Sequence, residues 1–214
     1  MGSSNTGPNG GRAARLRNRS TRHSKHARLA NGLTFFMPNT KQLMNAVAIQ
    51  RALARIAHEV AESQESGQDV AVLGIQSGGV VLAERLAKEL TKIWGSPVPV
   101  GQLDISMHRD DLDQRLTPTV HPTNIPFDVN GKVIVLVDDV LFTGRTIRAA
   151  MDALHDLGRP KLIRLAVLAD RGHRALPIKA DYVGKNIPTS LSERLNLKLK
   201  EQGHDHDALE LAQT

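Results

Sequence analysis

The residues best placed to do chemistry are two adjacent carboxylates, Asp138 and Asp139, which follow five consecutive apolar residues at 133–137. Five apolar residues in a row are typical of a β-strand that is covered on both faces. In an open parallel sheet, ligands bind beyond the carboxyl ends of the strands, which is where this pair is expected to lie. Two carboxylates can accept hydrogen bonds from the neighbouring hydroxyl groups of a ribose, so the pair indicates a sugar ligand.

The four residues that open the next predicted helix favour an anion. Free backbone N–H groups and the positive end of the helix dipole attract a phosphate, glycine permits close approach, and two hydroxyl groups can donate to it. A Walker A loop is excluded, because it would need a glycine where Asp139 stands. A ribose followed by a phosphate is therefore the predicted ligand, and the alternative is a capped helix with exposed aspartates. The four residues are Thr143, Gly144, Arg145 and Thr146.

Strands and helices alternate along the chain around this segment. Such an alternation implies an α/β fold with a parallel sheet and right-handed crossovers. Residues 108–126 are polar and irregular, which predicts a long loop. Apolar periodicity predicts a helix capped by Asn39 or Thr40 and ending near 65, a helix across 82–90 that ends near 95, a helix across 147–154, and strands at 69–75, 98–105, 133–137 and 162–168.

The composition predicts a soluble protein with one folded domain. A chain of 214 residues can bury a substantial core, and 40% hydrophobic residues exclude a wholly disordered chain. No run of about 18 uncharged apolar residues is present, which excludes a membrane-spanning helix. The chain has no cysteine, so disulfides, thiolate metal sites and a cysteine nucleophile are excluded. This composition fits a reducing compartment, and the cytoplasm is the expected location.

The positive charge is concentrated at the N-terminus. The total is +6, and residues 1–36 hold seven Lys and Arg residues and no Asp or Glu, which leaves −1 for the remainder. We expect residues 1–36 to be a disordered basic extension and residues 37–214 to form the folded domain. We favour translation from codons upstream of a true start at Met37 over a transit peptide or a nucleic-acid-binding arm.

The segment VIVLVDDVLFTGRT, residues 133–146, resembles the ribose-phosphate loop of the type I phosphoribosyltransferases, in which two acidic residues and apolar residues precede T-G-x-T. Three further segments resemble the PyrR family, whose members are pyrimidine operon attenuation regulators and uracil phosphoribosyltransferases. The resemblance covers about residues 42–200 and implies a type I phosphoribosyltransferase fold, with a parallel sheet flanked by helices and a small hood. The three segments are RIAHE (55–59), DISMHRDDL (104–112) and DRGHRALPIKADYVGKNIPTS (170–190).

This resemblance implies the transfer of ribose 5-phosphate from phosphoribosyl pyrophosphate to uracil, which gives UMP and pyrophosphate with Mg²⁺ as cofactor. Cleavage at the anomeric carbon loads negative charge on the departing pyrophosphate, so Mg²⁺ and cationic side chains are expected to neutralise it. The sequence assigns no protein residue to the metal. A homo-oligomer is also expected.

By resemblance, the acidic pair holds the ribose hydroxyl groups, residues 143–146 hold the 5-phosphate, and a strand-to-helix turn matches the pyrophosphate loop. The family commonly has Thr-Arg where this chain has Ser77-Gly78, so one guanidinium for the leaving group is missing. The affinity for phosphoribosyl pyrophosphate and the rate of transfer are therefore expected to be lower. The residues of the pyrophosphate loop are Gln76, Ser77, Gly78 and Gly79.

The long predicted loop contains Arg109, Asp110 and Asp111, and in the family it folds over the bound pyrophosphate. Closure of such a lid would exclude water and limit hydrolysis of the donor. Arg109 is the expected catalytic cation. Apart from the neighbouring motifs, the three residues would be interpreted as a solvated charge cluster.

Phe142 favours a pyrimidine as the acceptor base. Purine-specific relatives generally carry an acidic residue here for proton transfer, which a phenyl ring cannot perform. Pyrimidine members usually have Tyr, so Phe142 lacks only a hydroxyl group. Another pyrimidine or a purine remains the alternative acceptor. By analogy, uracil is read mainly by backbone groups in a hood that contains Tyr182, Val183, Gly184 and Lys185.

The resemblance also implies binding of a stem-loop in the leader of pyrimidine mRNA, favoured by uridine nucleotides in the active site. Such contacts would be dominated by phosphates, with unpaired bases read in the loop. Ala54 lacks a hydroxyl group that the family often shows, and the body carries −1, so ordinary surface charges are the alternative. A regulator with weak or no catalysis is a second alternative. The matching basic residues are Arg55, His58, His173, Arg174, Lys179 and Lys185.

The polar segment at residues 204–207, His-Asp-His-Asp, contains possible metal ligands. No predicted element holds these residues in place. A solvated tail is therefore favoured over a metal site.

Overall fold

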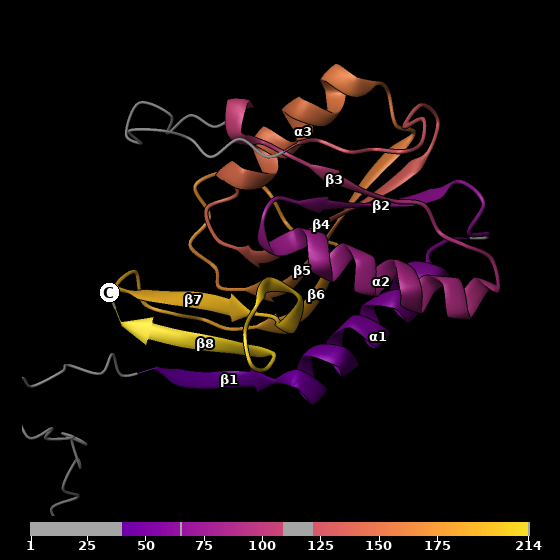
Figure 1. Cartoon of the computed structure of the whole chain (residues 1–214). Helices are drawn as coiled ribbons and strands as arrows, with labels where there is room; N and C mark the ends of the chain where they lie inside the picture. The colour runs from indigo at the N-terminus through magenta and orange to yellow at the C-terminus, as the bar shows by residue number, and fades with distance from the viewer. Residues whose placement is uncertain (1–39, 65, 109–121, 214) are drawn as a thin grey trace, which may run out of the picture. The chain divides into compact units, whose positions relative to one another are not determined.

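The computed structural model describes residues 40–64, 66–108 and 122–213. Its centre is a five-stranded sheet with the strand order β3-β2-β4-β5-β6, in which every neighbouring pair is parallel (Figure 1). This arrangement confirms the predicted α/β fold with a parallel sheet. The strands are β2 (Val70–Ile75), β3 (Val100–Leu103), β4 (Val133–Leu141), β5 (Leu162–Asp170) and β6 (Tyr182–Asn186).

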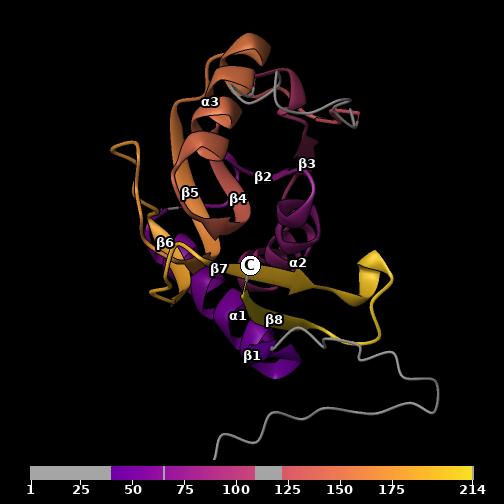
Figure 2. The ribbon, with the colours of Figure 1, turned by 90° about the vertical axis from the view of Figure 1, so that its left-hand side faces the viewer.

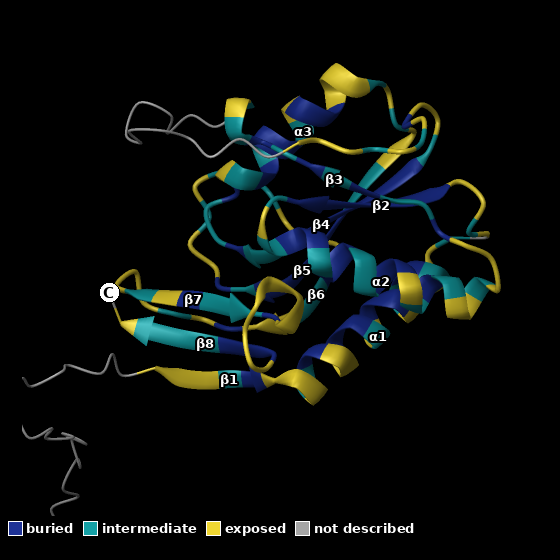
Figure 3. Ribbon diagram, viewed as in Figure 1, coloured by how far each residue is buried: buried dark blue, intermediate teal, exposed yellow. Residues whose placement is uncertain are grey.

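Helices cover both faces of this sheet (Figure 2). Helices α1 (Ala46–Glu62) and α2 (Gly78–Trp94) pack on one face, and α3 (Arg145–Leu157) packs on the other. Alternate side chains of β4 point to opposite faces, so Val135 joins the α1–α2 core and Ile134 joins the α3 core. Both β2 and the first part of β4 are buried on both faces, as their apolar runs predict (Figure 3). None of the helices in the described ranges is both long and apolar enough to cross a membrane.

A separate antiparallel sheet of three strands, in the order β1-β8-β7, forms the hood (Figure 1). Its strands are β1 (Lys41–Asn45), β7 (Glu193–Lys198) and β8 (Ala208–Gln213). Because β8 pairs with both of the others, the hood joins the beginning of the described chain to its end.

The start of the first helix differs from the prediction. Helix α1 begins at Ala46, and the side chain of Asn45 caps it by accepting a hydrogen bond from the N–H of Ala48 at 2.9 Å. The residues before it form β1 instead of a helical turn capped by Thr40. Pairing with β8, at the other end of the chain, decides this conformation, and a local pattern cannot show such a partner. The other predicted cap, Asn39, lies outside the described residues.

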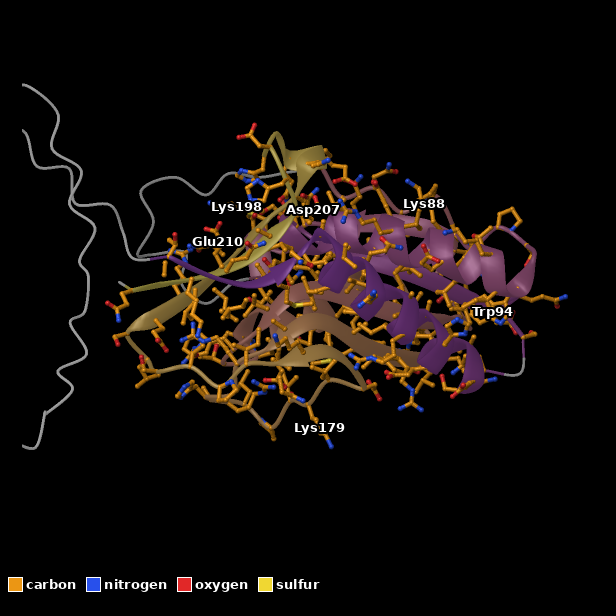
Figure 4. The ribbon with its side chains drawn as sticks, turned by 90° about the horizontal axis from the view of Figure 1, so that it is seen from below. Lys88, Trp94, Lys179, Lys198, Asp207 and Glu210 are labelled. Carbon is orange, nitrogen blue, oxygen red and sulfur yellow. The ribbon has the colours of Figure 1, made fainter. Side chains whose placement is uncertain are left out.

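The C-terminal segment also differs from the prediction of a solvated tail. Asp207 is 8% exposed and is followed by strand β8. Its carboxylate accepts a hydrogen bond from Arg85 of α2 at 2.7 Å, and Arg85 also donates to Glu201 at 2.9 Å. We call these three residues the hood latch, because they attach the β7–β8 connection to α2. Figure 4 shows Asp207 beside the hood strands.

Two groups of candidate site residues lie in different elements from those predicted. The analogy puts Tyr182–Lys185 in the hood, whereas these residues lie in β6, the edge strand of the parallel sheet. Strand β4 continues past Val137 to Leu141, so the acidic pair lies within the strand and not after it. The reason is that β5 stays paired with β4 as far as Asp170.

Candidate functional site

The acidic pair lies where β4 extends beyond its neighbour β2. The two strands pair as far as Gly74 and Val137, after which the chain of β2 turns into α2. Asp138 is 6% exposed and accepts a hydrogen bond from the N–H of Asp139 at 2.9 Å. Asp139 in turn accepts one from the N–H of Val140 at 2.7 Å. The two carboxyl groups are thus oriented by the backbone at the carboxyl end of the sheet.

The start of α2 packs directly against this extension of β4. A Cβ atom added at Gly78 would overlap the carboxyl group of Asp139, and one added at Gly79 would overlap the carbonyl oxygen of Val137. The peptide bond between Gln76 and Ser77, just before the helix, is cis. The predicted pyrophosphate loop and the acidic pair are therefore brought together, and the glycines permit their close approach.

Burial raises the pKa of the Asp139 carboxyl group above its ordinary value, because low-dielectric surroundings disfavour the charged form. The hydrogen bond from Val140 and the positive charge of Arg194, a residue of β7, act in the opposite direction. Ligand groups that donate hydrogen bonds to the carboxylate would therefore stabilise its charged form.

The second part of the candidate site is the turn between β4 and α3. Gly144 caps α3 with φ of 91°, a conformation that favours glycine, and a Cβ atom there would lie 3.3 Å from the side chain of Ile178. The carbonyl group of Thr143 accepts hydrogen bonds from the N–H groups of Ala175 at 3.0 Å and Leu176 at 3.2 Å. The segment after β5 therefore supports this turn from the side of its carbonyl groups.

Arg174, one of the residues expected to bind RNA, anchors the same turn. Its guanidinium donates to the carbonyl oxygens of Phe142 at 2.8 Å, Gly172 at 3.1 Å and Ile178 at 2.9 Å, and pairs with Asp170 at 2.5 Å. A guanidinium has five N–H donors, and this environment uses most of them. Arg174 is a structural residue of the turn.

Phe142 is covered by two residues of the segment that follows β5. The guanidinium of Arg171 lies 4.0 Å from the centre of its ring, and the ring of His173 meets it edge-on at 6.0 Å. Sequence reasoning missed Arg171, although it lies within the segment that carries the resemblance, at residues 170–190. The sequence indicates Arg171 only as a third basic residue near His173 and Arg174. Such a cluster does not show which of its members is buried.

The residues expected to read the base are dispersed over both sides of β6. Tyr182 is 7% exposed in the α1–α2 core, and its hydroxyl group lies 2.6 Å from Oγ of Ser63. Val183 faces the α3 core, and a Cβ atom at Gly184 would overlap the carbonyl oxygen of Leu168. The structure therefore places the side chain of Tyr182 in the core, where it packs beside α1.

The basic residues expected to bind RNA lie on three segments of the described chain. Arg55 of α1 donates to the carbonyl oxygens of Val183 at 2.9 Å and Gly184 at 2.6 Å, so it connects α1 to β6. Lys185 donates to the carbonyl oxygen of Leu43 at 3.1 Å. His58 and Lys179 are exposed, on α1 and on the β5–β6 connection.

A surface cavity of about 500 Å³ lies beside the β5–β6 connection. Lys179 lines it and points outward in Figure 4. Asp170, Arg171, Arg174 and Asn186 also contribute. The expected lid residues Arg109, Asp110 and Asp111 lie outside the described residues.

Comparisons with known proteins agree with this architecture. A model of the phosphoribosyl transferase domain matches residues 39–196. The Bifunctional protein PyrR of Listeria welshimeri is 57% identical over 171 residues, covering 78% of this chain and 93% of the relative. That of Chloroflexus aurantiacus is 58% identical over 166 residues, covering 77% and 91%.

Solved structures share the fold at lower identity. The hypoxanthine phosphoribosyltransferase of Trypanosoma cruzi has a TM-score of 0.61 at 17% identity, covering 81% of this chain and 96% of that one. A hypoxanthine-guanine phosphoribosyltransferase of Bacillus anthracis has a TM-score of 0.60 at 18% identity, covering 81% and 97%. The domain match and the identity to the curated relatives together show that the chain belongs to the phosphoribosyltransferase family and, within it, to the bifunctional PyrR proteins.

Proposed function

We propose that the protein transfers ribose 5-phosphate from phosphoribosyl pyrophosphate to uracil, and that it also binds a pyrimidine mRNA leader in response to uridine nucleotides. The observation that carries the transferase proposal is the position of the acidic pair, between the start of α2 and the start of α3. A phosphorylated pentose needs hydroxyl acceptors next to amide donors, and this edge of the sheet supplies both.

In this proposal, Asp138 and Asp139 accept hydrogen bonds from the ribose hydroxyl groups. The backbone N–H groups at the start of α3, with Thr143, Gly144, Arg145 and Thr146, hold the 5-phosphate. Binding both ends of the sugar fixes the anomeric carbon against the base, which lowers the entropic part of the barrier.

The leaving pyrophosphate is assigned to the start of α2, at residues 76–79. This turn carries no cationic side chain, so its donors are neutral: backbone N–H groups, the hydroxyl of Ser77 and the side-chain amide of Gln76. Arg109, with Asp110 and Asp111, is proposed to close over the leaving group as the lid and to supply the missing positive charge.

The carboxylate pair also fits Mg²⁺. Carboxylate oxygens are hard ligands, and Mg²⁺ is usually bound through one or two carboxylates together with substrate phosphates. A bound cation would also stabilise the charged form of Asp139, which burial disfavours by raising the pKa of that carboxyl group. When bound, Mg²⁺ neutralises the charge that develops on the pyrophosphate.

Uracil is proposed to bind beside Phe142 and the carboxyl end of β6, at Lys185. Tyr182, Val183 and Gly184 contribute only through their backbone, since the side chain of Tyr182 is buried in the core. The phenyl ring provides an apolar surface without a proton-transfer group, which favours uracil over a purine.

RNA binding is the second proposed activity. It is supported by the exposure of His58, Lys179 and Lys185. Arg55, His173 and Arg174 are retained together with their backbone contacts. Such a surface would bind mainly phosphates and lose affinity as salt rises. A gel shift with a leader stem-loop, with and without UMP, tests it, and retention that ignores UMP contradicts it.

The transferase proposal is tested by pyrophosphate release with uracil and donor. Asp138→Asn combined with Asp139→Asn is expected to abolish release while the circular dichroism spectrum is kept. Asp152→Asn, on the exposed face of α3, is the matched control and should retain full activity. Turnover with orotate or hypoxanthine, and none with uracil, would contradict the proposal that uracil is the acceptor. The predicted homo-oligomer remains to be tested by sedimentation.

The absence of a cation from residues 76–79 favours the alternative of a regulator with weak catalysis. Such a protein would bind UMP and RNA, but it would release little pyrophosphate. Comparison of UMP affinity with turnover in the same preparation distinguishes the two.

A further inference from the structure

The guanidinium of Arg171 is buried between the β4–α3 turn and the segment that leads into the hood. The residue follows β5 directly, is 7% exposed, and its backbone N–H donates to the carbonyl oxygen of Leu141 at 3.1 Å. Its side chain turns toward residues 189–193, just before and at the start of β7. This charge is therefore removed from water at a junction between the parallel sheet and the hood.

Three hydrogen bonds fix the guanidinium to that segment. Nε donates to Oγ1 of Thr189 at 2.9 Å, and Nη2 donates to the carbonyl oxygens of Ser190 at 3.0 Å and Glu193 at 2.8 Å. Burial lowers the pKa of Arg171, and the charge of Glu193 acts against this shift. A buried guanidinium is costly unless its donors are paired, so this geometry strongly selects one position for residues 189–193.

The face of the same guanidinium lies on the ring of Phe142, 4.0 Å from its centre. Cation–π contacts of this kind are favourable, and more so when they are desolvated. The ring of His173 meets Phe142 from a second side, and its Nε2 lies 2.6 Å from the carbonyl oxygen of Thr189. Phe142 is thus linked twice to the segment that begins the hood.

These contacts connect two parts of the proposed site that are distant in sequence. Phe142 directly precedes the turn assigned to the 5-phosphate, and its carbonyl group is held by Arg174. With the side chain held by Arg171 as well, the residue is fixed at both ends. The position of the hood segment relative to the ribose-phosphate turn therefore depends on the three hydrogen bonds of Arg171, with a second contact through His173.

We infer that Arg171 is a positioning residue that holds the hood segment 189–193 against Phe142 and thereby sets the geometry of the acceptor-base site. The effect on the base rests on the proposed transferase function. The effect on the hood does not, since it concerns the free protein alone. Arg171 itself is not assigned any contact with substrate.

The first test measures amide hydrogen exchange in the free protein, which needs no activity. Arg171→Met keeps the apolar stem but removes the charge and all donors. It should increase exchange within residues 189–195 by about tenfold while the α1–α2 core stays protected. Arg164→Met is the matched control. It removes a partly exposed ion pair with Asp181 near the start of β5, far along the strand from residue 171, and should leave this segment unchanged. Unchanged exchange in Arg171→Met would overturn the inference.

The second test separates acceptor from donor. Arg171→Met should raise KM for uracil about tenfold, with kcat and the KM for phosphoribosyl pyrophosphate within about twofold. Arg171→Lys keeps a cation on the ring but loses the planar set of donors. Its KM for uracil should lie between those of the wild-type protein and Arg171→Met. A parallel rise of both KM values, or a uniform rise in exchange, would show a general loss of structure and contradict a positioning role.

A double-mutant cycle shows whether Arg171 acts through the ring. Phe142→Leu removes the partner of the guanidinium, so Arg171→Met in that background should change the uracil KM by no more than about twofold. Full additivity would contradict the proposed route. If the wild-type protein gives no turnover with uracil, the transferase proposal fails, and the exchange experiment still decides whether Arg171 holds the hood.

Discussion

The carboxyl group of Asp139 occupies the space in which a side chain at residue 78 would begin, so Gly78 and Asp139 are in direct contact. This contact joins the turn assigned to pyrophosphate to the pair assigned to ribose. It also bears on the glycine at residue 78, where the family commonly has arginine. A larger residue there would add a side chain for the leaving group only by displacing a carboxylate that the sugar needs.

Gly78→Ala isolates this steric effect, because alanine adds a Cβ atom and no charge. We expect the affinity for UMP to fall about tenfold, equivalent to about 1.4 kcal/mol, as Asp139 is pushed from its position. Calorimetric titration with UMP measures the change, and the thermal midpoint reports whether the fold is kept. An unchanged affinity would show that Asp139 moves without cost.

Arg194→Met is expected to shift the pH dependence of catalysis. The positive charge of Arg194 favours the ionised form of Asp139, so its removal should raise the pKa of that carboxyl group further. The acid limb of kcat/KM against pH should then move to higher pH. Lys198→Met, on the same strand and paired with Glu210, is the control that should leave the limb in place. A shift to lower pH would contradict the assignment.

The hood latch makes stability depend on pH. Hydrogen bonds from Arg85 lower the pKa values of Glu201 and Asp207. Carboxyl groups with a lowered folded-state pKa stabilise the protein above their unfolded pKa of about 4, and this stability is lost as the pH falls through the folded-state pKa. The unfolding free energy should therefore decrease below about pH 4.

Asp207→Asn tests that latch, because it leaves the guanidinium of Arg85 with one carboxylate fewer. A loss of about 2 kcal/mol at pH 7 is expected, and the variant should show a weaker decline in stability with acid. Urea unfolding at several pH values measures both. Asp152→Asn, in an exposed pair with Arg148, should lose much less. Equal losses in the two variants would contradict a specific latch.

The sequence predicts those parts of the molecule that local patterns determine. The five apolar residues before Asp138 identify a strand buried on both faces, and Gly95 marks the end of α2 with φ of 68°. The acidic pair and the start of α3 are placed together because they are neighbours in sequence. Their roles toward a ligand stay predictions.

The features that were missed depend on partners far along the chain. β1 and β8 are strands because they pair with each other, and Asp207 is buried because Arg85 reaches it. Tyr182 fills the core beside α1, a position that its motif does not reveal. The contacts of Arg174 also could not be predicted, because its acceptors are backbone carbonyl groups, which no residue pattern displays.

The transferase proposal is tested most directly by steady-state release of pyrophosphate from phosphoribosyl pyrophosphate across a panel of nucleobases. With Mg²⁺ present, release is predicted with uracil, and it should disappear when Asp138 and Asp139 are both changed to Asn. Release that survives this double substitution, or that requires hypoxanthine or orotate, would contradict the account.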